Sequence, residues 1–219
     1  MARLLFEKTG KAIWISHLDL MKVFQRAFQR AKLPLIHTNG FNQRPSVSIA
    51  LPMSVGISSR CELLDFDLDR WEVALEDIPQ LLNPVLISGV KVLDCYEKSR
   101  KIKEIAYLDY EILLHYDRCV TSIEKEKLTD LFHRESILVE KRNRNGVTQQ
   151  DIIPLLRHFE IETDGDRTMK IRAVICCQNP ALNPAQLISA IAQELPELKP
   201  DQISYHRLEV LDAQEKTFR

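Results

Sequence analysis

The sequence predicts an α+β protein made of two tandem ferredoxin-like units, each with the order β-α-β-β-α-β, an antiparallel sheet and both helices on one face. Three observations support this prediction. Strand-like and helix-like segments alternate in that order within residues 1–98, and a charged stretch follows at 97–103. The same order, with one extra strand, then restarts within residues 104–219. We therefore expect two domains, 1–98 and 104–219, that share structure rather than sequence.

The elements of the first domain follow from apolar spacing and capping residues. An apolar run predicts a strand at 3–6, and Ser16 followed by Asp19 predicts a capped helix that continues to about Lys32. Apolar residues at helical spacing are expected to form its buried face: Leu18, Met21, Phe24, Ala27, Phe28 and Ala31. Further strands are expected at 35–38, 47–51, 61–68 and 85–96, with a second helix from residue 69 or 70 to 82.

The second domain shows a similar alternation. Its expected strands lie at 106–116, 136–141, 154–162, 168–177 and 204–211, and its expected helices at 121–133 and 184–195. Asn183 is the predicted cap of the last helix, and a basic turn is expected at 142–146. The Asp164-Gly165-Asp166 segment predicts a tight hairpin.

Composition is typical of a soluble globular protein, with 45% hydrophobic and 28% charged residues among 219. No run approaches the roughly 18 apolar residues of a membrane span, and the N-terminal residues do not resemble a signal peptide. We expect a cytoplasmic protein without a membrane partner. The five cysteines include no C-x-x-C pair and no C-x-x-x-C-x-x-C cluster motif, so we expect buried thiols, no metal site and no cofactor.

The net charge of −1 hides a strong asymmetry along the chain. Residues 1–60 contain nine Lys and Arg residues against two acidic ones, whereas residues 61–96 contain eight acidic residues against two basic ones. Within the basic part, Lys22, Arg26 and Arg30 are spaced four apart, so they form one ridge on a helix face opposite Phe24 and Phe28. No acidic residue four positions away neutralises this ridge.

A loop at 40–56, rich in Gly, Asn and Pro, follows the basic helix and is a candidate binding segment. Arginine suits phosphate contacts, so basic residues near this loop would extend the ridge. The predicted nucleic-acid-binding residues are Lys22, Arg26, Arg30, Asn42, Arg44 and Arg60. The alternatives are a solvated helix face and an ordered loop without a ligand.

Two histidines are weak catalytic candidates. His17 lies at the expected start of the basic helix, and His37 lies shortly before the loop. Either imidazole could act as a general base or orient a substrate, but each could equally pack or cap the local structure. No phosphate-binding glycine motif and no nucleophile motif is present.

Three segments together resemble the radical SAM-linked protein family, a domain family of unknown function. They are SHLDLMKVFQRAFQRAKLP (16–34), GFNQRPSVSIALPMSVGISS (40–59) and CELLDFDL (61–68), and the resemblance covers about residues 2–96. The usual family pattern at the loop is closer to G-F-N-P-H-P, whereas this chain has Gln43 and Arg44 there. The resemblance implies a radical SAM protein as partner, either in trans or within the same longer chain. At the level of fold, the layout also resembles CRISPR RNA-processing endoribonucleases.

The leading functional hypothesis is a non-catalytic accessory module that presents RNA, such as tRNA or rRNA, to a radical SAM enzyme. A protein-docking domain for the radical SAM subunit is the main alternative, with the acidic stretch 61–96 and the loop as its surface. A metal-independent endoribonuclease that uses His17 or His37 is the least favoured hypothesis.

Overall fold

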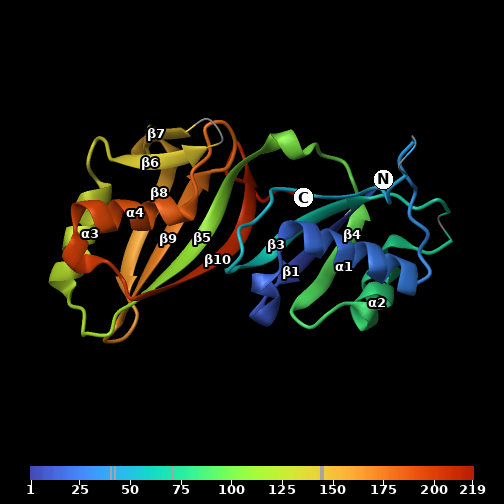
Figure 1. The fold of residues 1–219 in the computed structure, drawn as a ribbon, viewed down its shortest axis with the longest axis horizontal. Helices are drawn as coiled ribbons and strands as arrows, with labels where there is room; N and C mark the ends of the chain where they lie inside the picture. The colour runs from blue at the N-terminus through green and yellow to red at the C-terminus, as the bar shows by residue number, and fades with distance from the viewer. Residues whose placement is uncertain (40, 42, 71, 144–145) are drawn as a thin grey trace. The chain divides into compact units, whose positions relative to one another are not determined.

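The computed structural model describes residues 1–39, 41, 43–70, 72–143 and 146–219. It confirms the predicted α+β class, with antiparallel strand pairs and four α-helices among these residues. Residue contacts divide the chain into two compact units, Met1–Glu104 with Arg219, and Ile105–Phe218 (Figure 1). Within the described ranges, no helix has the length and apolar character needed to cross a membrane.

The first unit has an antiparallel sheet in the order β4-β1-β3-β2. Its elements along the chain are β1 (Ala2–Lys8), α1 (His17–Arg30), β2 (Val47–Ile49), β3 (Ile57–Phe66), α2 (Ile78–Leu82) and β4 (Val90–Glu97). Short 3-10 segments precede both helices, at Gly10–Trp14 and Leu75–Asp77. Since the central strands β1 and β3 are separated by α1 and its following loop, the sheet positions that loop beside α1.

Both helices of the first unit pack on the same face of its sheet. The ring centroids of Phe6 and Phe24 lie 4.7 Å apart, and those of Phe28 and Phe66 lie 4.8 Å apart. Ile78 of α2 is fully buried in the same apolar cluster. Since burying each such side chain contributes roughly 1.5–3 kcal/mol, these contacts anchor α1 on the sheet.

The predicted buried face of α1 is correct except at its start. Phe24, Ala27 and Phe28 are buried, but Leu18 is 71% exposed and Leu20 is buried instead. Leu20 precedes Phe24 by four residues and therefore shares its face. Leu18 precedes Phe24 by six residues, which turns it away by about 120° at 3.6 residues per turn. Leu18 is thus left on the outer side of the helix.

Two predicted elements of the first unit are much shorter than expected. Only Ile78–Leu82 of the expected helix 69–82 is α-helical, because Pro79 cannot continue a helix from the preceding residues. The expected strand 35–38 is reduced to two isolated bridges, Leu35 with Leu68 and His37 with Pro45. The effect of Pro79 on the helix could have been predicted from the sequence.

The predicted last strand of the first unit begins five residues late, at Val90. A 3-10 segment at Asn83–Val85 and a turn at Gly89 precede it. Gly89 has a φ of +86°, and its carbonyl accepts a hydrogen bond of 2.7 Å from the Thr9 amide. A Cβ atom at this position would lie 2.4 Å from the Thr9 carbonyl oxygen, so only glycine fits the turn.

The second unit has a four-stranded antiparallel sheet in the order β10-β5-β9-β8 and a separate hairpin, β6-β7. Its elements are β5 (Ile105–His115), α3 (Ser122–Phe132), β6 (Leu138–Asn143), β7 (Gly146–Asp151), β8 (Leu156–Thr163), β9 (Thr168–Cys176), α4 (Pro184–Glu194) and β10 (Gln202–Asp212). The prediction of a single extra strand is wrong, because β7 forms a second one. Its sequence, GVTQQD, is too polar to indicate a strand.

Two predicted turns of the second unit have different outcomes. The hairpin at Asp164–Asp166 is present, where the Asp164 amide donates a hydrogen bond of 2.8 Å to the Thr168 carbonyl and Gly165 has a φ of +76°. The basic turn predicted at 142–146 centres on Arg144 and Asn145, which lie outside the described residues.

The prediction of buried cysteines holds for Cys61 and Cys95 but fails for Cys119, which is exposed. Burial raises the pKa of the Cys95 thiol to about 12. Cys176 and Cys177 are half-buried at the end of β9, and burial raises the pKa of Cys177 to about 11. The two thiols with strongly raised pKa values are suited to packing rather than to nucleophilic chemistry at neutral pH.

Candidate nucleic-acid interface

The start of α1 is fixed by a reciprocal cap. Ser16 accepts a hydrogen bond of 3.2 Å from the Asp19 amide, and its hydroxyl donates one of 2.8 Å to the Asp19 carboxylate. Lys22 donates a further hydrogen bond of 3.0 Å to the same carboxylate. The Ser16 hydroxyl and the Lys22 ammonium hold the pKa of Asp19 below its usual range. This cap fixes where α1 begins, while its buried apolar side chains determine which face is turned outward.

The outward face of α1 is basic. Lys22, Arg26 and Arg30 are all exposed, as the four-residue spacing predicts. Asp19 partly neutralises the charge of Lys22. This ion pair was missed in the sequence because only acidic residues four positions away were considered, whereas Asp19 is three positions away. No carboxylate in the part of the chain that the structure describes forms an ion pair with Arg26 or Arg30. These two guanidinium groups are therefore available to an anionic ligand.

The segment after α1 folds back along the helix as a closed loop. The Thr38 amide donates a hydrogen bond of 2.8 Å to the Arg44 carbonyl, and the Arg44 amide donates one of 3.1 Å to Thr38 Oγ1. The Ser46 amide donates to the Ile36 carbonyl at 2.7 Å, which extends the pairing by one step. Phe41, within this loop, is fully exposed. The hydrogen bonds thus hold Arg44 at the base of the loop.

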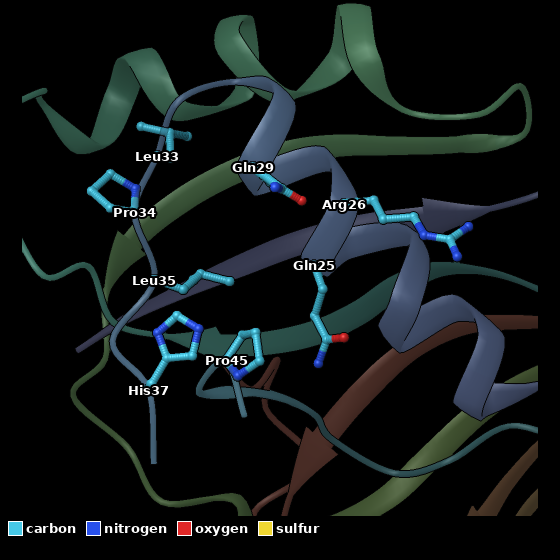
Figure 2. Close-up of a pocket in the computed structure, with 8 residues that line it drawn as sticks. All are labelled: Gln25, Arg26, Gln29, Leu33, Pro34, Leu35, His37 and Pro45. Carbon is cyan, nitrogen blue, oxygen red and sulfur yellow. The ribbon is translucent and has the colours of Figure 1, made fainter. Parts of the chain in front are cut away.

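Two adjacent hollows lie between α1 and this loop, and we call them together the α1 trough. The larger, of about 600 Å³, includes His17, Lys22 and Arg44 in its lining. The smaller, of about 420 Å³, is shown in Figure 2 and is lined by Gln25, Arg26, Gln29, Leu33, Pro34, Leu35, His37 and Pro45. The two hollows share Gln25 and Pro45, so they adjoin.

The structure therefore brings together most of the residues predicted from the sequence. His17, Lys22 and Arg44 line the larger hollow, while Arg26 and His37 line the smaller one. Each histidine belongs to a different hollow, so the two imidazoles do not share one cavity.

Two predicted residues do not line the trough. Arg30 lies one turn beyond Arg26 on the exposed ridge of α1. Arg60 lies six residues before the end of β3 at which Val47 pairs with Phe66, a separation of roughly 20 Å along a strand. Asn42 lies outside the described residues.

Sequence reasoning missed three residues of this region: Gln25, Gln29 and Phe41. Gln25 and Gln29 are four residues apart and flank Arg26, so the same helical spacing that revealed the basic ridge could have found them. Phe41 follows a glycine in a polar loop, where an apolar side chain has little to pack against. Its full exposure is informative because an isolated large aromatic side chain is available for contact with a ligand.

The acidic segment 61–96 is less exposed than the sequence suggested. Within the stretch 61–96, which was expected to form an acidic docking surface, Asp65 is only 6% exposed. It accepts hydrogen bonds of 2.7 and 3.2 Å from the Arg3 guanidinium and forms an ion pair of 2.7 Å with Lys98. Glu62 is also buried. These two carboxylates therefore do not contribute to an acidic docking surface.

Most of the basic residues at 1–60 remain exposed in the structure. Among the nine basic residues at 1–60, Arg3 and Lys8 are buried, and the Lys8 ammonium donates a hydrogen bond of 2.9 Å to the Ile15 carbonyl. The other seven are exposed: Lys11, Lys22, Arg26, Arg30, Lys32, Arg44 and Arg60. Of the two acidic residues in this range, Glu7 is half-buried and Asp19 is paired with Lys22. The exposed charge of the segment is thus strongly positive.

Residues 2–184 match a family described as an uncharacterized protein conserved in bacteria, DUF2344. The chain belongs to this family. The family is one of unknown function, as expected, but its description includes neither a radical SAM protein nor a CRISPR endoribonuclease. A comparison with curated proteins finds no match.

Two solved structures share the fold at low sequence identity. One is a crystal structure of a Cbf5-Nop10-Gar1 complex, with a TM-score of 0.54 and 8% identity over 95% of this chain and 48% of that one. The other is an H/ACA RNP bound to a substrate RNA containing 2'-deoxyuridine, with a TM-score of 0.53 and 8% identity over 95% and 47%. This chain therefore spans about half the length of the chains that it resembles.

Proposed function

We propose that the chain is a non-catalytic accessory module that binds RNA along the α1 trough of its first unit. The observation that supports this most is the placement of Lys22, Arg26 and Arg44 around two adjoining hollows on one side of α1. Phosphate contacts from Lys and Arg supply most of the affinity of nucleic-acid binding, and contacts to bases add selectivity. The trough contains both cations that can contact phosphates and uncharged polar side chains that can contact bases.

The fold is compatible with this role. The strand orders β4-β1-β3-β2 and β10-β5-β9-β8, with antiparallel neighbours, are those expected of two ferredoxin-like units, the second carrying an inserted hairpin. RNA-binding domains with such sheets often stack bases on aromatic side chains of the sheet. Here we place the RNA on the helical side instead, because Lys22, Arg26 and Arg30 form an exposed ridge on α1. One structure of similar fold is bound to a substrate RNA, which fits an RNA-related role.

We further propose that the module presents RNA, such as tRNA or rRNA, to a radical SAM protein. This part rests on the resemblance of residues 16–34, 40–59 and 61–68 to radical SAM-linked proteins. We expect a module that handles RNA of this kind to act in the cytoplasm. A role in protein docking through residues 61–96 is less favoured, because Asp65 and Glu62 are buried.

A ribonuclease activity is also less favoured by the geometry. Metal-independent RNA cleavage commonly needs a base and an acid at the same phosphate. His17 and His37 line different hollows, so a single phosphate in either hollow meets one imidazole. We therefore expect RNA to remain intact when incubated with the protein, which gel electrophoresis of labelled RNA would check.

The proposal is tested by a salt titration of binding to a fluorescein-labelled single-stranded RNA, followed by fluorescence anisotropy. Each phosphate contact to a single strand contributes about 0.7 to the slope of log affinity against log salt. The triple variant Lys22→Ala/Arg26→Ala/Arg44→Ala should thus reduce the slope by about 2 and weaken binding at low salt. These side chains are exposed, so the fold should persist.

The matched control is Lys91→Ala. Lys91 is an exposed cation of the same unit, but it lies on β4 between Val90 and Val92, which point toward the helices. Its side chain therefore faces the other side of the sheet, and its removal should leave the slope unchanged. Equal effects of the control and triple variants, or no RNA binding by the wild-type protein at low salt, would contradict the proposal.

A further inference from the structure

We infer that the smaller hollow of the α1 trough is a binding pocket for one unpaired nucleobase of the RNA. This inference rests on the proposed function, because the nucleobase arrives attached to a phosphate chain held by the basic residues of the trough. The pocket volume of about 420 Å³ lies within the usual range for small-ligand sites, roughly 300–1,000 Å³.

The inner part of the pocket suits a flat, largely apolar ring. Leu33 and Leu35 are 4% and 7% exposed and form its floor, and Pro34 and Pro45 contribute further apolar surface. Figure 2 shows the His37 ring beside Pro45, on the side of the pocket opposite α1. Unpaired bases of RNA commonly stack on aromatic side chains, including the imidazole of histidine.

The helical wall of the pocket carries two carboxamide groups. Gln25 and Gln29 are four residues apart and both line the pocket, and in Figure 2 the Gln25 side chain extends from α1 on the side where Pro45 lies. Within the described part of the chain, neither side-chain amide forms a hydrogen bond with another protein group. Each amide has one acceptor oxygen and two N–H donors, which matches the mixed donor and acceptor edges of a base. Gln is the usual bidentate partner of adenine.

Arg26 completes the site from outside. Its guanidinium belongs to the lining but points away from His37 (Figure 2). This direction suits a phosphate next to the bound base rather than the base itself. The neighbouring hollow shares Gln25 and Pro45 and contains Lys22 and Arg44, so the adjoining nucleotides would meet further cations there.

The lining argues against other small ligands. It contains no carboxylate and only one histidine, so it offers a cation no anionic partner. No group of three or more His, Cys, Asp or Glu side chains that could hold a metal ion is found among the described residues. A free phosphate would use Arg26 and the N–H donors of the two carboxamides, but it would leave the apolar lining and the carboxamide oxygens without a partner. A nucleobase uses the apolar lining together with the donors and acceptors of both carboxamides, and its adjoining phosphate uses Arg26.

The test compares four homopolymeric oligoribonucleotides with an abasic oligoribonucleotide of the same length, again by anisotropy. Wild-type protein should bind oligoadenylate most tightly, and it should prefer it to the abasic strand by about 5- to 150-fold, the discrimination of one bidentate contact. The variant Gln25→Ala/Gln29→Ala should lose this preference but keep the salt slope of the wild type. Alanine is the best helix former, so α1 should persist in this variant.

Two further variants sharpen the result. Gln80→Ala removes an exposed glutamine from α2 of the same unit and should change nothing. Gln25→Glu/Gln29→Glu keeps the side-chain size but replaces N–H donors with acceptors, and it should weaken binding of oligoadenylate more than the alanine variant does.

The possible failures are distinguishable. If wild-type protein binds the abasic strand as tightly as the homopolymers, with a normal salt slope, the pocket inference is wrong and the proposed RNA binding stands. The pocket inference is likewise wrong if the Gln25→Ala/Gln29→Ala variant keeps the wild-type base preference. If wild-type protein binds none of the strands, both the inference and the proposed function are wrong.

Discussion

Thr38 and Arg44 are joined by two hydrogen bonds that run in opposite directions across the base of one loop. The Thr38 amide donates to the Arg44 carbonyl at 2.8 Å, and the Arg44 amide donates to the Thr38 hydroxyl oxygen at 3.1 Å. The pair holds Arg44, which lies in the loop that follows α1, beside the basic face of the helix. The positioning of Arg44 therefore depends on Thr38, a neutral residue that also lines the larger hollow.

Replacing Thr38 with valine should weaken RNA binding. The substitution keeps the shape of the side chain but removes the acceptor for the Arg44 amide, a hydrogen bond that contributes about 0.5–1.5 kcal/mol. We expect a loss of affinity of about 2- to 10-fold with little change in thermal stability, since the pair is exposed. Anisotropy and thermal melts of the two proteins would check this. An unchanged affinity would show that the loop does not position a contact residue.

Replacing Asp19 with asparagine should strengthen RNA binding. Lys22 donates to the Asp19 carboxylate at 3.0 Å, so this anion competes with a phosphate for the ammonium group. Removing the charge should raise affinity a few-fold and steepen the salt slope by up to about 0.7. The Ser16 hydroxyl still accepts from the backbone amide of residue 19, which retains part of the helix cap. Weaker binding by a folded variant would contradict a role for Lys22.

Replacing Asp65 with asparagine should destabilise the first unit. Its carboxylate accepts two hydrogen bonds from Arg3, which is fully buried, and pairs with Lys98 at 2.7 Å. Removing one partner of a buried ion pair leaves an uncompensated charge and costs about 3–5 kcal/mol. Chemical denaturation would measure the loss. Asp69→Asn, at an exposed position nearby, is the matched control and should leave the free energy of unfolding almost unchanged.

The start of α3 should contribute a pH-dependent stability to the second unit. Hydrogen bonds from the Thr121 hydroxyl and amide, together with Arg118, lower the pKa of Glu124 from 4.5 to about 2. Because the folded-state pKa is the lower one, this stabilisation is complete above about pH 4.5 and is lost as the pH falls toward 2.

The variant Glu124→Gln should therefore be less stable than wild type at neutral pH, and the difference should shrink as the pH falls from about 5 to 2. Denaturation curves at several pH values in this range would show the trend. Glu126→Gln, at an exposed position on the same helix, should show no such pH-dependent difference from wild type. A gap between Glu124→Gln and wild type that stayed constant with pH would rule out this account of the cap.

The sequence predicted those features that depend on local spacing. The limits of α1 followed from Ser16, Asp19 and Pro34, and its exposed cations followed from their four-residue period. Arg44 beside this helix was also suggested, because the loop follows α1 directly. Local signals of this kind sufficed for the centre of the candidate site.

The remaining features depend on tertiary pairing. Arg60 carries the same charge as Arg44, but the register of β2 on β3 places it toward the other end of the strand. Asp65 belongs to an alternating acidic run, yet Arg3 and Lys98 enclose it from distant parts of the chain. The carboxamides of Gln25 and Gln29 became notable only once residues 33–45 were seen to form the opposite wall of a pocket.

The most direct test of the central claim is to locate bound RNA on the protein by ultraviolet crosslinking and mass spectrometry. We expect crosslinks in peptides from α1 and from residues 33–48, with His37 and the exposed Phe41 as the foremost sites. The crosslinks should disappear in Lys22→Ala/Arg26→Ala/Arg44→Ala and persist in Lys91→Ala. Crosslinks confined to residues 105–218, or equally strong in the triple variant, would contradict RNA binding at the α1 trough.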